Sequence, residues 1–441
     1  MKVAAAPEVS SRANVTPEDN ELLTRVGPGT PMGELLRRYW LPLIESEELG
    51  PPDGPPRRVR LLGENLVVFR DSSGRVGLLE ERCPHRGASL FFARNEEGGL
   101  RCVYHGWKFN AEGRCLETPT DPSESFARGV RPRAYRCVER NGVAWAFLGP
   151  EGADIPALPD LGWAVVAPEH RSTLTYLRRC NWLQALEGDM DTAHLGWLHA
   201  RMDETGRRRL PPRAEDSHRD RVAEDLAPVL SVVDHTAGIT VAARRNDGDG
   251  GHYWRISQFL MPIFTSVPAT GRLRRAKAWV PLDDEHTLVW ERNWDPSAPL
   301  SEEQRRGRAG RVPGSGMHDE GDEPLSRGRF VASRENDYLI DRERQRTASF
   351  SGLEESAPVQ DAAVQESMGP IVDRSREHLG ASDEAIIRVR RRLIEAARAL
   401  RDLGAQPPGV RSPGSYRLRG CQLVLPAGAD WQEASREEQR S

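Results

Sequence analysis

Two short stretches of cysteine and histidine constrain this chain more than any other feature of its sequence. The first is Cys83-Pro84-His85 and the second is Cys102-Val103-Tyr104-His105, with sixteen residues between His85 and Cys102. Each stretch offers one thiolate and one imidazole, and a glycine follows each histidine within two residues. Because glycine lets a backbone turn tightly beside a bound group, the pattern predicts two similar metal-binding loops.

Two cysteines and two histidines are the ligands of the Rieske [2Fe–2S] centre, in which both imidazoles bind one iron and raise the reduction potential. Such a centre accepts and passes single electrons. A structural zinc site is the alternative, because mixed Cys/His sets also bind zinc. Zinc sites usually contain Cys-x-x-Cys, which neither stretch has. The two motifs, with Arg86-Gly87 and Gly106-Trp107 attached, favour the Rieske centre.

Strand-like segments flank both loops, and turn sequences separate them. A small antiparallel β-domain is therefore expected to carry the loops. Pro31–Leu49 is predicted to be a helix that leads into this domain. The predicted strands are Arg58–Leu62, Leu66–Arg70, Arg75–Glu80, Trp107–Asn110 and Val143–Leu148.

The remainder of the 441-residue chain is long enough for a second domain with its own core. Its predicted elements are strands and helices without a βαβ alternation, so the expected fold class is α+β. The predicted helices are Asn181–Ala200 and Ser382–Leu403, the latter ended by Gly404, and the predicted strands are Val229–Asp234, Ile239–Ala243, Tyr253–Leu260, Ala276–Val280 and Thr287–Asn293.

Composition shifts along the chain give the expected domain boundaries. A Pro/Gly-rich linker near residues 150–160 separates the two domains. Pro299–Gly328 is rich in Arg, Gly and Glu and is predicted to be a mobile loop. We expect a flexible tail (1–20), a Rieske domain with its leading helix (21–155), a catalytic domain (156–405) and a C-terminal extension (406–441).

Charge and hydropathy argue against several classes of partner. The formal net charge of −4 does not favour nucleic acid, and no apolar run approaches the roughly 20 residues of a membrane span. The N-terminus lacks the apolar core of a signal peptide. Four further cysteines have no pairing pattern, so reduced thiols and a cytoplasmic location are expected; they are Cys115, Cys137, Cys180 and Cys421.

A second candidate metal site lies in the predicted helix, where His194 and His199 are five residues apart. On a regular helix these side chains would point about 140° apart. Both can reach one metal only if the helix ends between them or carries a one-residue bulge, and Gly196 would ease either deviation. Alone, the pair could equally be two buried structural histidines. However, a Rieske cluster needs an acceptor for the electrons that it carries. Two histidines with one carboxylate form the facial triad of non-haem Fe(II), which would be such an acceptor.

The carboxylate of such a triad has to come from later in the chain. Asp361 is favoured because it shares a helical face with Val364 and Met368, and an acid among apolar residues needs a compensating cation such as a metal. An ordinary acid near a helix N-terminus is the alternative. The other candidates are Asp337, Asp341, Glu366 and Asp373.

Asp191 lies one turn before His194 and is predicted to accept a hydrogen bond from an imidazole N–H. The alternative for Asp191 is a solvated helix acid.

Together, the paired Cys/His motifs and Asp191-x-x-His194-x4-His199 resemble the Rieske non-haem iron oxygenases, or ring-hydroxylating oxygenases. The resemblance extends from about residue 20 to about 405 and is greatest to phthalate-dioxygenase-type oxygenase alpha components. It also puts the carboxylate ligand at Asp361. The stretches that carry this closer similarity are Asn181–His199, Glu335–Tyr338 and Asp361–Leu379.

The resemblance implies an oxygenase component that takes electrons from a separate NAD(P)H-dependent flavin and iron–sulfur reductase. The cluster would pass them to a mononuclear Fe(II), where O2 is activated beside an aromatic substrate, carboxylated or not. The outcome would be cis-dihydroxylation, monohydroxylation or demethylation. Gly27-Pro28-Gly29 and Gly314-Ser315-Gly316 lack the context of a dinucleotide-binding fingerprint, so a partner has to supply the electrons.

The resemblance further implies a head-to-tail homotrimer, or a dimer of trimers, in which the cluster of one subunit faces the iron of its neighbour. Asp191 would then bridge an iron-binding histidine to His85 or His105 of the next subunit.

Two other functions compete with an oxygenase. A Rieske electron-transfer protein without oxygenase chemistry needs only the first domain, and a metal count would separate it, at about two irons per chain against about three. A regulatory protein with a degenerate second site is disfavoured by the intact triad.

Three arginines on predicted strands are candidates for binding a substrate carboxylate: Arg244, Arg245 and Arg255. Strand alternation turns only one of Arg244 and Arg245 inward. The alternative is that these arginines line a solvated strand face.

Overall fold

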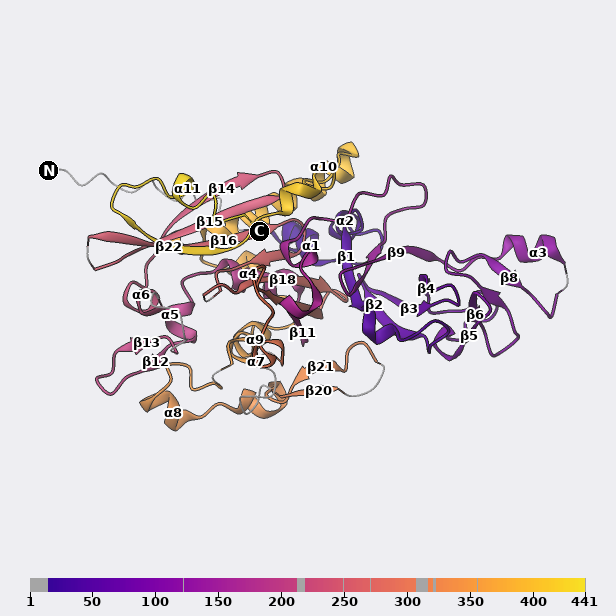
Figure 1. Cartoon of the computed structure of the whole chain (residues 1–441), viewed down its shortest axis with the longest axis horizontal. Helices are drawn as coiled ribbons and strands as arrows, with labels where there is room; N and C mark the ends of the chain where they lie inside the picture. The colour runs from indigo at the N-terminus through magenta and orange to yellow at the C-terminus, as the bar shows by residue number, and fades with distance from the viewer. Residues whose placement is uncertain are drawn as a thin grey trace.

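The computed structural model describes residues 15–121, 123–211, 219–248, 250–269, 271–306, 316–319, 323–354 and 356–440. Figure 1 shows an elongated molecule. The strands that carry the Cys/His loops lie at one end, and a large antiparallel sheet with most of the helices occupies the other. The α+β class predicted from the sequence is confirmed.

The N-terminal domain contains two antiparallel sheets. The larger has the strand order β1-β10-β9-β4-β3-β2, and the smaller has the order β5-β6-β7-β8 and carries the metal-binding loops. The strands of the larger sheet are β1 (Trp40–Glu45), β2 (Arg57–Leu61), β3 (Glu64–Arg70), β4 (Val76–Glu80), β9 (Ala134–Arg140) and β10 (Val143–Phe147). Those of the smaller sheet are β5 (Arg94–Glu96), β6 (Gly99–Arg101), β7 (Lys108–Phe109) and β8 (Cys115–Glu117), and helix α3 (Glu124–Gly129) follows.

The prediction of one helix over Pro31–Leu49 is wrong beyond its first turns. Helix α2 covers only Pro31–Leu36, with Thr30 as its N-cap, and the chain then enters strand β1. Five of the six residues of β1 are buried, and β1 pairs with β10. Burial on both faces gives an unbroken apolar run, which has neither helical nor strand periodicity.

The second domain is built on an eight-stranded antiparallel sheet of order β11-β19-β18-β17-β16-β15-β14, with β22 pairing the free part of β16. All five strands predicted from the sequence are present, and β11, β17 and β22 are additional. The strands are β11 (Arg171–Arg178), β14 (Val229–His235), β15 (Gly238–Asn246), β16 (Gly251–Leu260), β17 (Phe264–Ser266), β18 (Arg274–Pro281), β19 (Thr287–Trp294) and β22 (Cys421–Pro426).

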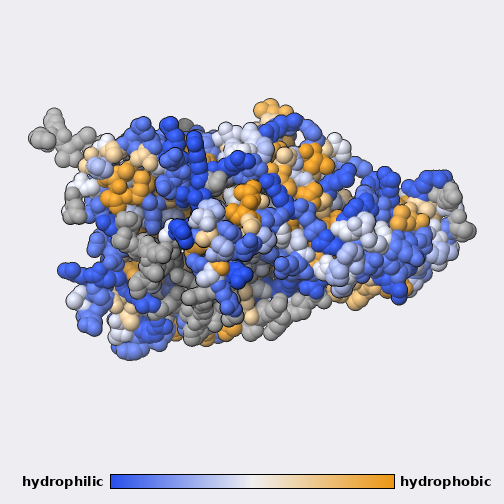
Figure 2. Space-filling view, in the orientation of Figure 1, coloured by the Kyte–Doolittle hydropathy of each residue, from blue (hydrophilic) through white to orange (hydrophobic). Residues whose placement is uncertain are grey.

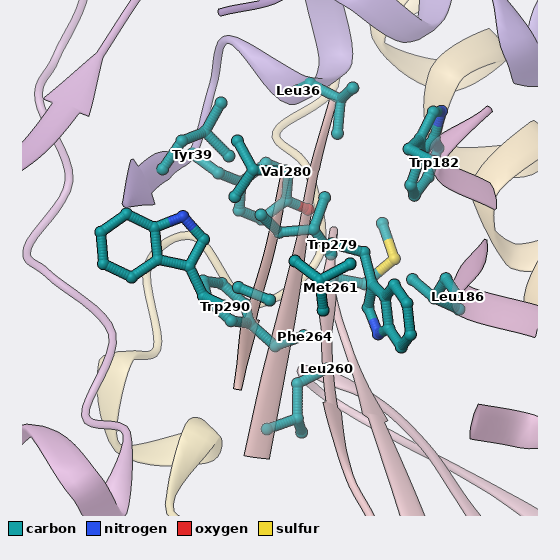
Figure 3. Packing of buried hydrophobic residues seen from close by; sticks show 14 of the residues in the cluster. Leu36, Tyr39, Trp182, Leu186, Leu260, Met261, Phe264, Trp279, Val280 and Trp290 are labelled. Carbon is teal, nitrogen blue, oxygen red and sulfur yellow. The ribbon is translucent and has the colours of Figure 1, made fainter. Parts of the chain in front are cut away.

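Helices cover this sheet and contribute to a continuous apolar core. Trp182 and Leu186 of helix α4 belong to the same apolar cluster as Trp279 and Met261, and Leu186 lies beside the Trp279 ring (Figure 3). The long helix α10 was predicted almost to the residue, and Gly404 ends it in the left-handed conformation. The helices are α1 (Pro17–Thr24), α4 (Trp182–Met190), α5 (Leu195–Leu198), α6 (Arg219–Glu224), α8 (Arg342–Thr347), α9 (Ala357–Ser367), α10 (Glu384–Leu403) and α11 (Trp431–Ala434).

Several segments expected to be irregular contain regular structure. Helix α1 begins at Pro17, inside the segment 1–20 that was expected to be a tail, and β22 places part of 406–441 in the eight-stranded sheet. In Pro299–Gly328, helix α7 (Glu302–Arg306) and strand β20 (Met317–Asp319) are formed, and β20 pairs with β21 (Arg327–Phe330). Residues 307–315 and 320–322 of that predicted loop lie outside the described residues. Strands β12 (Arg201–Met202) and β13 (Arg208–Arg209) form a small hairpin.

The surface drawn in Figure 2 is largely hydrophilic, with scattered small apolar patches. In the part of the chain that the structure describes, no helix is both long enough and apolar enough to span a bilayer.

Candidate metal centres and substrate pocket

The two Cys/His loops have the same backbone conformation. The N–H of Gly87 donates to the carbonyl of Cys83, and the N–H of Gly106 donates to the carbonyl of Cys102, at 2.8 and 2.9 Å. Both glycines have a positive φ, of 75° and 76°. The tight glycine turns predicted from the sequence are thus present, and they bring the two loops face to face.

The side chains of these loops meet in two pairs. The buried thiols of Cys83 and Cys102 contact each other, and the rings of His85 and His105 lie 4.4 Å apart between centroids. Among the described residues, these four donors do not form a group in which three ligand atoms lie within 4.8 Å of one another. A single zinc ion needs one compact set of donors, whereas a two-iron cluster separates a thiolate pair from an imidazole pair.

The chemical state of these donors also fits a cluster. Burial, with a smaller contribution from Cys102, raises the pKa of the Cys83 thiol to about 11, so a positive metal is needed to hold the thiolate. Burial and the neighbouring His85 and Arg86 lower the pKa of His105. The Nδ1 atom of His105 is buried without a hydrogen-bond partner, as expected of a metal-binding nitrogen.

The histidines of the second site lie at the two ends of a single-turn helix. Helix α4 ends at Met190, the backbone of Asp191 is extended, and α5 runs from Leu195 to Leu198. His194 precedes α5 and His199 follows it, so the helix ends at Leu198, between the two histidines, as one of the expected alternatives requires. The single predicted helix Asn181–Ala200 is wrong, because a second break separates α4 from His194.

The role expected of Gly196 is also corrected. This residue is helical, and a Cβ atom there would lie 2.7 Å from the Val222 carbonyl oxygen of α6. Close packing of α5 on α6 therefore requires the glycine.

Three side chains converge beside α5. Oδ1 of Asp361 lies 3.3 Å from Nε2 of His199 and 3.8 Å from Nε2 of His194. These three residues form the one group in the described part of the chain with three potential metal ligands within 4.8 Å. Burial opposes ionisation of Asp361, but His199, His194 and Arg178 outweigh it and lower its pKa, so the carboxylate is charged. Two imidazole nitrogens and one carboxylate on one side of a cavity match the facial triad of Fe(II).

The sequence argument that singled out Asp361 was wrong in one respect. Val364 and Met368 are exposed, and the buried face of α9 instead carries Val359, Ala362 and Ala363. The other candidate carboxylates have different partners. Glu366 accepts from the hydroxyl of Tyr338 and the backbone of Arg179, and Asp341 and Asp373 cap helical turns. Asp337 lies in a left-handed turn.

In each histidine, the Nδ1 atom has a hydrogen-bond acceptor beside it. Oδ2 of Asp191 lies 3.4 Å from Nδ1 of His194, and its Oδ1 accepts from the N–H of Ala193. Oε1 of Gln360, a buried residue, lies 2.6 Å from Nδ1 of His199. Each acceptor favours a proton on Nδ1, which leaves the Nε2 lone pair facing Asp361. Gln360 was missed in the sequence because its partner is 161 residues away.

A pocket of about 110 Å³ opens beside the three residues. For comparison, an engineered apolar cavity of about 150 Å³ holds benzene, so this pocket is slightly smaller than one that takes a single aromatic ring. Its apolar wall comes from Leu195, Leu210, Val222, Val267 and Pro268. Its polar wall carries Arg255, Arg275 and Lys277 from β16 and β18, and Gln422 from β22.

The three arginines predicted to meet a substrate carboxylate have different environments. Arg245 is the inward member of its pair, but its guanidinium donates to the carbonyl oxygens of Thr192 and Asp225. Arg244 is half-exposed and does not line the pocket. Arg255 lines the pocket. Lys277 and Gln422, which also line it, were not found in the sequence because distant strand pairing brings them there.

Comparisons with known proteins agree with this geometry. Residues 39–131 match the Rieske [2Fe-2S] domain, and residues 146–441 match a family described as LigXa C-terminal domain like. The chain is 38% identical to the 3-chlorobenzoate-3,4-dioxygenase oxygenase subunit of Comamonas testosteroni, over 95% of this chain and 97% of the relative. It is 36% identical to the phthalate 4,5-dioxygenase oxygenase subunit of Pseudomonas putida, over 95% and 94%.

Among solved structures, the NdmA QL mutant of Pseudomonas putida CBB5 with theobromine has the same fold, with a TM-score of 0.58. The sequences are 18% identical, and the match covers 90% of this chain and 99% of that one. The paired Cys/His loops, the convergent histidines and carboxylate, and the near full-length matches lead to one assignment. The chain belongs to the Rieske non-haem iron oxygenases and is an oxygenase alpha subunit of the phthalate-dioxygenase-like group, with a Rieske [2Fe–2S] cluster.

Proposed function

We propose that Cys83, His85, Cys102 and His105 hold the Rieske cluster, and that His194, His199 and Asp361 hold a mononuclear Fe(II). The convergence of two Nε2 atoms and Oδ1 of Asp361 carries this proposal. Iron held there would keep coordination positions open for O2. The protein's part is to orient both imidazoles through Asp191 and Gln360 and to hold the substrate in the adjoining pocket.

The proposed reaction is the dioxygenation of a small aromatic acid. Its support is the pocket, which is lined by both apolar and basic side chains. The two relatives named above are called dioxygenases of 3-chlorobenzoate and of phthalate, which are both aromatic acids. A neutral aromatic ring would pack on Leu195 and Val222, while a carboxylate would meet the cations of the strands.

The electrons come from a partner, since an oxygenase subunit works with a reductase. We propose that this partner is an NAD(P)H-dependent flavin and iron–sulfur protein. We further propose that both proteins act in the cytoplasm, a reducing compartment that suits a chain whose six cysteines form no disulfide.

A ring of three subunits, or a stack of two such rings, is the proposed assembly. The cluster loops lie at one end of the molecule, and α5, with the histidines at its ends, lies toward the other (Figure 1). Apolar side chains are exposed at both places: Val103 and Tyr104 on a cluster loop, and Trp197 and Phe350 near the histidines. Exposed apolar patches of this kind mark protein contacts. In a head-to-tail ring, Val103 and Tyr104 of one subunit would cover Trp197 and Phe350 of its neighbour.

The function is tested with purified protein, a compatible reductase, NADH and 18O2. Substrate-dependent O2 uptake with 3-chlorobenzoate or benzoate, and a diol carrying two labelled oxygen atoms, is the expected result. A product carrying one labelled oxygen atom would instead indicate monooxygenation. An electron carrier without oxygenase chemistry would give no product and about two irons per chain instead of about three.

A further inference from the structure

A second cavity, of about 440 Å³, lies where the Rieske domain, the eight-stranded sheet and the β20–β21 hairpin meet. It shares no lining residue with the pocket beside the candidate iron site. We call this cavity the interdomain recess. Its apolar walls include Leu43 of β1, Val59 of β2, Leu288 and Trp290 of β19, and Met317 of β20.

The interdomain recess and the candidate iron site lie on opposite faces of the eight-stranded sheet. In the register of β18 and β19, Trp290 stands opposite Ala278. Lys277, the residue before Ala278, lines the pocket beside the iron site. Because successive side chains of a strand point to opposite faces, Trp290 faces away from the iron site. A molecule in the recess would therefore not touch the substrate.

The interdomain recess is enclosed by three structural units. The Rieske domain forms one wall, the sheet forms a second, and the hairpin, which lies beside β11 in Figure 1, forms the third. The hairpin is held tightly, because a Cβ atom on Gly328 would lie 3.0 Å from the Cα of Tyr176 in β11. All of the lining residues are buried or half-buried. The volume is within the range of about 300–1,000 Å³ that is usual for small-molecule sites.

The charges on the walls of the recess are neutralised by the protein itself. The remaining surface is mostly apolar. An anion or a cation that entered the recess would have to separate one of these pairs or stay without a partner, and either is costly in a half-buried site. The recess therefore favours a neutral ligand. The pairs are Arg58 with Glu81 and Glu323, Arg60 with Asp283, and Arg327 with Glu48.

We propose that the interdomain recess binds a neutral aromatic molecule of about two rings, independently of the substrate at the iron site. An engineered cavity of about 150 Å³ holds one benzene ring, so 440 Å³ gives room for two fused rings. The ligand would contact Leu43 and Val59 of the Rieske domain and Leu288 and Trp290 of the sheet together. Because it binds both domains only when they are docked, it would stabilise their docked arrangement.

The test is titration calorimetry on the oxidised holoenzyme at pH 7, with saturating benzoate present to occupy the pocket beside the iron site. The probes are 2-naphthol, which is neutral, and 2-naphthoate, which has the same ring system and one negative charge. Wild-type protein is expected to bind 2-naphthol, to bind it equally well with and without benzoate, and to bind 2-naphthoate at least roughly 10-fold more weakly.

A variant that fills the recess tests where the probe binds. Thr175 of β11 lines the recess, and Thr175→Trp should weaken 2-naphthol binding roughly 10-fold or more, because the added indole takes the space of the probe. Val229→Trp is the matched control. Val229 is exposed on β14 of the same sheet and does not line the recess, so this variant should bind 2-naphthol as the wild type does. The visible spectrum of the Rieske cluster checks that both variants are folded.

A second variant tests the charge of the recess. Glu48→Gln removes the acid that pairs with Arg327. It should strengthen 2-naphthoate binding roughly 10-fold, the usual effect of a hydrogen bond to a charged group, and leave 2-naphthol binding unchanged. A gain of binding cannot result from damage to the fold, so this variant decides the matter if Thr175→Trp does not fold.

The proposal is overturned if 2-naphthol does not bind, or if benzoate displaces it, which would place the probe beside the iron site. Normal 2-naphthol binding by folded Thr175→Trp would also overturn it. So would equal binding of the two probes by the wild type, or no gain of 2-naphthoate binding in Glu48→Gln. The inference goes beyond the proposed function, and none of these measurements depends on turnover.

Discussion

Oε1 of Gln360 lies 2.6 Å from Nδ1 of His199, and Gln360 is the residue immediately before Asp361. Helix α9 therefore supplies both a candidate iron ligand and the acceptor that orients another. Because both groups sit on one turn of α9, a small movement of this helix would disturb two of the three ligands together.

Gln360→Leu should weaken iron binding at the mononuclear site about 10- to 100-fold, the usual effect of losing an acceptor behind a metal-bound histidine. Gln360→Glu keeps an oxygen within reach of Nδ1 and should retain most of the affinity. The measurement is competition for Fe(II) with a chelator, with the visible spectrum of the Rieske cluster as an internal control. Equal iron affinity in Gln360→Leu and wild type would contradict the proposed role of this amide.

Asp191→Asn should leave both metal centres largely filled, because Asp191 is outside the group of three convergent ligands. It should slow oxidation of the reduced cluster strongly, since the amide replaces a charged acceptor at Nδ1 of His194. Single-turnover oxidation of the cluster, followed optically with substrate and O2 present, measures this. A wild-type rate in the variant, or a fully active monomer, would rule out electron transfer between subunits through Asp191.

Cys83→Ser and His105→Ala should each abolish the visible absorption of the Rieske cluster while the mononuclear site still binds iron. The reason is that the two metal sites share no residue and lie in separate parts of the molecule. Retention of a normal cluster spectrum in both variants would contradict the assignment of these ligands.

The ion pair between Arg60 of β2 and Asp283 links the two domains, and its contribution to the free energy of unfolding should depend on pH. Burial opposes ionisation of Asp283, but its bonds to His286 and the Glu285 N–H and the nearby Arg60 outweigh it and lower its pKa to about 2. A depressed carboxyl pKa contributes stability above the unfolded-state value near 3.8, and this contribution is lost as the pH falls through about 2. Asp283→Asn should thus lower the free energy of unfolding by about 2 kcal/mol at pH 7. The deficit should be the same at pH 5, as measured by urea unfolding, and a deficit that vanishes between pH 7 and pH 5 would contradict this account.

The parts of this structure that depend on residues close together in the chain could be predicted from local sequence patterns. The cluster loops, the strands around them and helix α10 are encoded in short motifs and periodicity, and these predictions are confirmed. Strand β1 was mistaken for helix because Trp40–Glu45 is buried on both faces and shows no alternation. The break before His194 was not predicted, and the close packing of α5 on α6 at Gly196 is a contact that no local pattern records.

Fewer residues of the pocket could be predicted from the sequence. Arg255 was a candidate because it lies on a predicted strand, but Gln422 reaches it through the pairing of β22 with β16, more than 160 positions away. Lys277 and Asp189 form their ion pair across 88 positions of the chain. Such contacts follow from the tertiary fold, and single residues of common type give no signal of them.

Iron content is the most direct test of the central claim, that His194, His199 and Asp361 hold a mononuclear iron beside a separate Rieske cluster. Wild-type protein should contain about three irons per chain. Asp361→Ala should contain about two, with an intact and reducible cluster and no oxygenation, because two neutral imidazoles alone hold Fe(II) weakly. Glu366→Ala is the matched control on the same helix and should keep about three. Loss of one iron from Glu366→Ala but not from Asp361→Ala would contradict the account.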